Sequence, residues 1–79
     1  MDKEIEARIA KDIEKFDETK DRLAKAGLSD EENMIFELAK MYAEDSKAWL
    51  AKKEYFTAFA GISYAHGLAD ALMKLKHIE

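Results

Sequence analysis

Apolar residues recur at helical spacing through the first third of the chain. From Ile5 onward they appear every three or four positions, apart from one longer gap after Phe16, and most positions between them are charged. The members of this stripe are Ile5, Ile9, Ile13, Phe16, Leu23 and Ala26. Gly27 is expected to end the helix in the left-handed conformation that glycine adopts readily. The pattern predicts an amphipathic helix over residues 3–26.

The segment "SDEE", from Ser29 to Glu32, predicts the start of a second helix. A serine followed three residues later by a glutamate is typical of a capping box, and acidic residues favour the positive helix end. We expect this helix over residues 30–52, with Asp45 interrupting its inner face and with Phe36 and Leu50 pointing away. The expected inner residues are Met34, Ile35, Leu38, Met41, Tyr42 and Trp49.

A sharp change in composition predicts a turn near Lys53 and Glu54. Of the 13 basic and 17 acidic residues, only four follow Glu54: Asp70, Lys74, Lys76 and Glu79. The third helix, expected over residues 55–76, is therefore apolar on most sides, through Phe59, Ile62, Ala65, Leu68, Ala69 and Leu72. The fold class that we predict is all-α, an antiparallel three-helix up-down bundle of long helices forming a single domain over residues 1–79.

Composition narrows the classes of partner. The chain of 79 residues has a net charge of −4 and no cysteine. An acidic protein lacks the surplus of Lys and Arg that holds phosphate backbones and anionic membranes, so we expect no nucleic acid and no membrane partner. The charged start is unlike a signal peptide, which predicts a cytoplasmic protein. Abundant Lys and Glu, with no glutamine and a single asparagine, are typical of proteins from thermophiles.

The stretch "ISYAHGLAD" brings Ser63, His66 and Asp70 onto one helical face. A serine hydrolase also needs an oxyanion hole, and the N–H groups within a helix are already bonded. We therefore expect no catalytic residue. A metal site built from Asp45, His66 and Asp70 would lack a second histidine, so we expect no metal ion and no cofactor.

A structural role is the simpler prediction for these polar residues. Antiparallel pairing of the second and third helices would bring Asp45 close to Ser63 or His66, where a partly buried carboxylate could fix the helix register. Asp45 could instead lie at the edge of the bundle and reach water. The candidate polar cluster comprises Asp45, Ser63, His66, Asp70, Tyr42 and Tyr64.

The last part of the chain resembles a known family. From Asp45 to Leu72, "DSKAWLAKKEYFTAFAGISYAHGLADAL" is similar to the archaeal family catalogued as domain of unknown function 357. The family-typical positions are Asp45, Tyr55, Tyr64, His66, Gly67, Leu68 and Asp70, whereas Lys53-Glu54 stands where the family often has Gly-Asp. The resemblance implies a small helical protein from an archaeon and no particular activity.

Two classes of function follow from these patterns. The first is a non-catalytic helical module for protein–protein interaction or structure. The alternative is a small-molecule or metal-dependent enzyme with a polar site around His66 and Asp70. Because the third helix has more apolar surface than two neighbours can cover, we expect a homodimer, or another protein as partner, with this helix at the interface.

Overall fold

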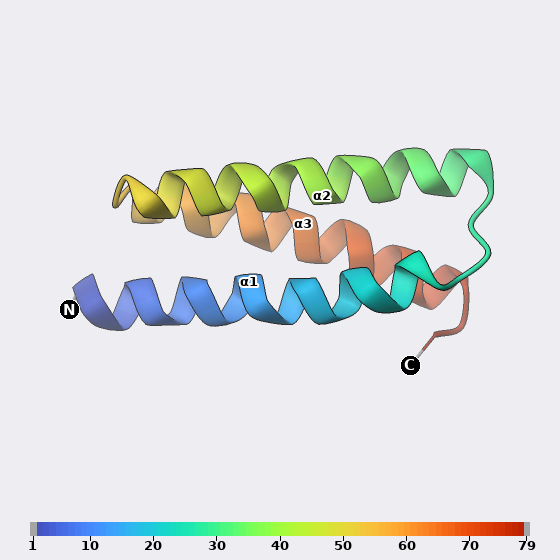
Figure 1. The fold of residues 1–79 in the computed structure, drawn as a ribbon, viewed down its shortest axis with the longest axis horizontal. Helices are drawn as coiled ribbons and strands as arrows, with labels where there is room; N and C mark the ends of the chain where they lie inside the picture. Colours follow the sequence, from blue (N-terminus) through green and yellow to red (C-terminus); the bar gives the residue numbers. More distant parts are fainter. Residues whose placement is uncertain (1, 79) are drawn as a thin grey trace.

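The computed structural model describes residues 2–78 and contains three α-helices (Figure 1). They are α1 (Asp2–Ala24), α2 (Asp30–Ala51) and α3 (Tyr55–Leu75), and their ends lie within two residues of the expected ranges. Consecutive helices run antiparallel, and the molecule measures 40 × 21 × 15 Å along its principal axes. The fold class predicted from the sequence, an all-α three-helix bundle, is confirmed.

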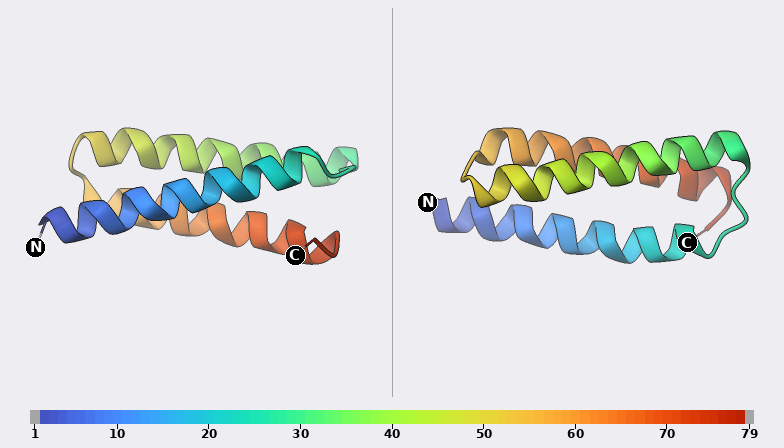
Figure 2. Two further views of the ribbon diagram at one scale, coloured as in Figure 1. Left: turned by 60° about the horizontal axis from the view of Figure 1, so that its bottom comes forward. Right: turned by 45° about the horizontal axis from the view of Figure 1, so that its top comes forward.

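The three helices form a triangular bundle rather than a flat layer. In Figure 1, α3 lies behind α1 and α2, and the turned views of Figure 2 show the three helices around a common centre. Each helix packs against both others. Within residues 2–78, every helix falls short of the apolar length that crossing a membrane requires.

The start of α2 has the capping box that the sequence predicts. The N–H of Glu32 donates to the Ser29 hydroxyl at 3.1 Å, and the N–H of Ser29 donates to the Glu32 carboxylate at 2.8 Å. The same carboxylate pairs with the ammonium of Lys76, 2.9 Å away, just beyond α3. A local cap therefore also ties the start of α2 to the end of α3.

Both α2 and α3 end in Schellman motifs. After α2, the N–H of Lys53 donates to Leu50 and the N–H of Glu54 to Trp49, each at 2.9 Å. Lys53 has a φ of 62°, the left-handed conformation that usually favours glycine. The same pair of bonds follows α3, where His77 has a φ of 56°.

The expected role of Gly27 is wrong. No glycine among the described residues has a positive φ, and α1 already ends at Ala24. The N–H groups of Lys25 and Ala26 bond instead to carbonyls three residues earlier, which tightens the last turn. Leu28 then packs against the core.

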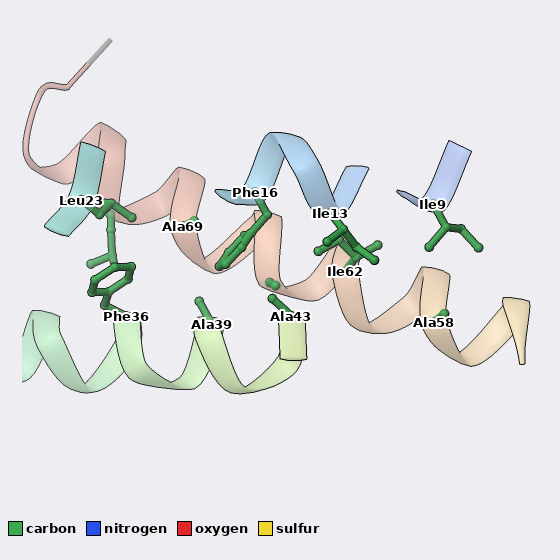
Figure 3. Close-up of a cluster of buried hydrophobic side chains, with 12 residues drawn as sticks. Ile9, Ile13, Phe16, Leu23, Phe36, Ala39, Ala43, Ala58, Ile62 and Ala69 are labelled. Carbon is green, nitrogen blue, oxygen red and sulfur yellow. The ribbon is translucent and has the colours of Figure 1, made fainter. Parts of the chain in front are cut away.

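The core combines large side chains from α1 with mostly small ones from α2 and α3 (Figure 3). As predicted, Ile9, Ile13, Phe16 and Leu23 are buried, although Ile5 remains 44% exposed. The buried residues of the other two helices are Phe36, Ala39, Ala43, Ser46, Ala58, Ile62, Ala65, Ala69 and Leu72. The many alanines allow α2 and α3 to approach closely.

Most of the inner face predicted for α2 is wrong, although Tyr42 does pack against the core. Met34 is 72% exposed and Trp49 is 40% exposed, whereas Phe36, expected to point away, is buried. Leu50 also packs against the core. Close packing against α3 requires small side chains on the facing side of α2, so the stripe of larger apolar residues is turned outward. Phe59, one of the apolar residues of α3, is likewise exposed.

Candidate functional site

His66 connects α3 to α1 rather than to α2. Its Nε2 atom lies 2.7 Å from the main-chain oxygen of Asp12. Because a carbonyl oxygen only accepts, Nε2 carries the hydrogen and donates it. The ring also packs edge-on against Phe16, with centroids 5.8 Å apart. His66 therefore holds two helices together, and this nitrogen is not free to act as a base.

The other members of the expected polar cluster do not join His66. Asp45, Ser63 and Asp70 are exposed, and within residues 2–78 none of these three side chains makes a hydrogen bond or ion pair. The interhelical cluster of Asp45 with Ser63 or His66 is therefore not formed. The second possibility, Asp45 at the bundle edge in contact with water, is the one observed. Asp70, on the surface, does not orient His66.

The polar residue of α2 that is buried against α3 is Ser46, whereas the sequence predicted Asp45 there. Its hydroxyl is fully buried and donates to the main-chain oxygen of Ala58 at 2.6 Å. It follows Ala39 and Ala43 at helical spacing, so it continues a stripe of small residues that could have signalled the seam with α3. The buried polar contact between α2 and α3 is thus a serine-to-carbonyl bond.

Two of the expected site residues line a hollow between α2 and α3, near the turn that joins them. We call it the notch; it has a volume of about 250 Å³. Its lining comprises Tyr42, Asp45, Trp49, Thr57, Ala60 and Gly61. The ring of Tyr64 packs against that of Tyr42 with centroids 4.6 Å apart, so Tyr64 borders this region. Trp49 also lines the notch, although the sequence predicted it on the inner face of the second helix and not at a site.

Comparison with known proteins extends the resemblance beyond the last helices. A family model described as "Protein of unknown function (DUF357)" matches residues 8–78. The chain belongs to the DUF357 family. The match includes most of α1 as well as α2 and α3. No curated protein matches this DUF357 chain.

Two further hollows of this DUF357 protein lie along α1. The one between α1 and α2, about 310 Å³, is lined mostly by charged residues that neutralise one another, such as Lys47 with Asp17 and Glu44. The one between α1 and α3, about 300 Å³, is lined by Ile5, Arg8, Ile9 and Phe59. Exposed ion pairs like those in the hollow between α1 and α2 contribute little to stability.

Metal-binding residues do not gather in the described part of this protein. Residues 2–78 contain no group of three or more His, Asp or Glu side chains placed to hold a metal ion. In particular, His66 and Asp45 lie on separate sides of α3, because His66 meets α1 whereas Asp45 faces Ala60 and Gly61. The structure therefore does not bring together Asp45, His66 and Asp70, the three residues considered above as metal ligands.

An apolar surface lies beside the notch, toward the ends of α2 and α3 that are far from their turn. On α3 its residues recur every three or four positions, and on α2 two residues fall on the adjacent side. The contact between Tyr42 and Tyr64 shows that the two stripes lie side by side. We call this surface the apolar face; it comprises Ile35, Leu38, Tyr64, Leu68, Ala71 and Leu75.

Proposed function

We propose that the protein is a non-catalytic helical interaction module that associates with a second copy of itself through the apolar face. The observation that carries this proposal is the exposure of that face. Leu75 is 61% exposed and Tyr64 is 49% exposed, in a chain where 38% of the residues are charged. Contiguous apolar surface of this kind is typical of protein interaction sites.

Charge supports a second copy as the occupant. None of the six positions of the apolar face is charged, so an identical surface brings no like charges together. A two-fold arrangement places the same patch on both partners, which suits a surface that is apolar throughout. A chain of 79 residues has a small core, and self-association is a common way to bury the remaining apolar surface.

The size of the apolar face sets the expected strength. From the exposed fractions of its side chains, it offers roughly 400 Å² of accessible surface per copy, hence about 800 Å² in a dimer. That total is below the standard size of a stable interface, about 1,200–2,000 Å². We therefore expect a weak dimer whose population depends on protein concentration.

Light scattering coupled to size exclusion tests the proposal with a matched pair of variants. Ala71→Lys places a charge on the apolar face, and Ala10→Lys places the same charge on an exposed position of α1. The unmodified protein and Ala10→Lys should rise from 9.0 kDa toward twice that mass as concentration increases. Ala71→Lys should remain a monomer with unchanged helical circular dichroism.

Two results would refute self-association through this face. One is a mass of 9.0 kDa for the unmodified protein up to millimolar concentration. The other is an equal loss of the dimer in Ala10→Lys and Ala71→Lys, which would assign the effect to added charge rather than to position.

A further inference from the structure

We propose that the notch is a binding site for a guanidinium group, presented by an arginine side chain of another polypeptide. The notch lies at the turn end of α2 and α3, whereas the apolar face extends toward their other ends. The inference therefore does not depend on self-association. Three properties of the notch lead to it: its charge, its aromatic lining and its size.

The single charge of the notch is an unpaired carboxylate. Asp45 is exposed and has no hydrogen bond or ion pair with any residue between 2 and 78, and the other five lining residues are uncharged. A hollow whose single charge is negative selects a cation. A carboxylate can also accept two parallel N–H bonds from a guanidinium group, which an ammonium group cannot offer in the same geometry.

The aromatic residues of the notch add a second attraction for cations. Tyr42 and Trp49 are seven residues apart on α2, two helical turns, and Asp45 lies between them on the same side. The electron-rich face of an aromatic ring attracts a cation, and guanidinium can stack on it. The ammonium of Lys52 lies 5.1 Å from the centre of the Trp49 ring, so this ring attracts a cation. A guanidinium group must compete with Lys52 there, while Asp45 and Tyr42 supply the rest of its attraction.

The opposite wall leaves room for a ligand the size of a side chain. It consists of Thr57 and Ala60, whose side chains are small, and Gly61, which has none. The volume of about 250 Å³ is below the roughly 300–1,000 Å³ typical of sites for drug-sized molecules. A guanidinium group with its methylene chain fits this space, and the methylenes can contact the aromatic rings.

Fluorescence titration tests the proposal directly, because Trp49 is the single tryptophan of the chain. The probe is N-acetyl-arginine methylamide, and its neutral isostere, the corresponding citrulline derivative, is the matched control. We expect a saturable change in Trp49 emission with the arginine probe and none with the citrulline probe. A similar response to both, or to neither, would overturn the proposal.

Two variants of the protein locate the binding. Asp45→Asn keeps the shape of the side chain and should weaken binding of the arginine probe about tenfold or more. Asp70→Asn removes another exposed carboxylate, on α3 outside the notch, and should bind like the unmodified protein. Equal affinities of Asp45→Asn and Asp70→Asn would refute the assignment of the site.

The titration is repeated on Ala71→Lys, whose substitution lies outside the notch. Retention of arginine binding in this variant is expected. If the unmodified protein is a monomer but binds the probe, self-association fails and the notch site stands; dimerisation without probe binding gives the reverse. Loss of binding in Ala71→Lys alone would show that the site requires the apolar face, contrary to the proposal.

Discussion

Two glycines of α3 allow the distance between α2 and α3 to be tested with one substitution. A methyl group added at Gly67 meets nothing within 4 Å, so alanine brings only its higher helix propensity. That gain is about 0.8–1 kcal/mol in a helix interior. At Gly61, the added methyl would lie 3.4 Å from Cβ of Ser46 and 3.4 Å from the main-chain oxygen of Tyr42.

The propensity gain is the same at both positions, but the contacts differ. Separations of 3.4 Å are at the short end of ordinary van der Waals contact, and one of the two contacting atoms belongs to the backbone of α2. At Gly61 the methyl therefore fills the remaining space between α2 and α3, which restricts their relative motion and offsets part of the gain. We expect Gly67→Ala to stabilise the protein by about 0.8 kcal/mol and Gly61→Ala to stabilise it less, or to destabilise it.

Thermal unfolding followed by circular dichroism measures this difference. For a domain of this size, about 1 kcal/mol corresponds to a shift in Tm of roughly 4–8 °C. Gly67→Ala should therefore raise the Tm by several degrees, and Gly61→Ala should fall clearly below it. If Gly61→Ala raises the Tm as much as Gly67→Ala, the space between α2 and α3 accommodates the methyl without cost, and the reasoning is refuted.

Three further predictions concern the helix ends and the buried serine. Lys53→Gly should raise the free energy of unfolding by about 0.5–1 kcal/mol in urea denaturation, because glycine adopts a φ of 62° without strain; lower stability would contradict this. Ser46→Ala removes the buried hydrogen bond to α3 and should lower the free energy of unfolding by about 1 kcal/mol; an unchanged urea midpoint would show that the bond contributes nothing. The pKa of Glu32 lies below its ordinary value of 4.5, because the Ser29 N–H and the Lys76 ammonium favour the carboxylate, so its stabilisation is complete above that value and is lost as pH falls through the lowered pKa. Glu32→Gln should therefore lower the Tm at neutral pH, and its difference from the unmodified protein should close in acid; a constant difference would exclude this linkage.

Local sequence by itself determined the three helices and one of their caps. The stripe from Ile9 to Leu23 marks the buried side of α1, because every other side of that helix is charged. The capping box from Ser29 to Glu32 involves only neighbouring residues, so its hydrogen bonds could be predicted from four letters of sequence. The change in charge after Glu54 located the second turn for a similar local reason.

Only the tertiary structure decided how these helices are rotated about their axes. Apolar residues surround much of α2, so hydrophobicity alone does not identify its inner side, and successive residues differ by about 100° in direction. Close packing against α3 selects the small residues, which buries Ser46 and leaves its neighbour Asp45 in the notch. The partner of His66 is a main-chain oxygen on α1, which any residue at position 12 would offer and which therefore has no signature in the sequence. Contacts between segments far apart in the chain depend on that rotation, and it is set by packing all three helices at once.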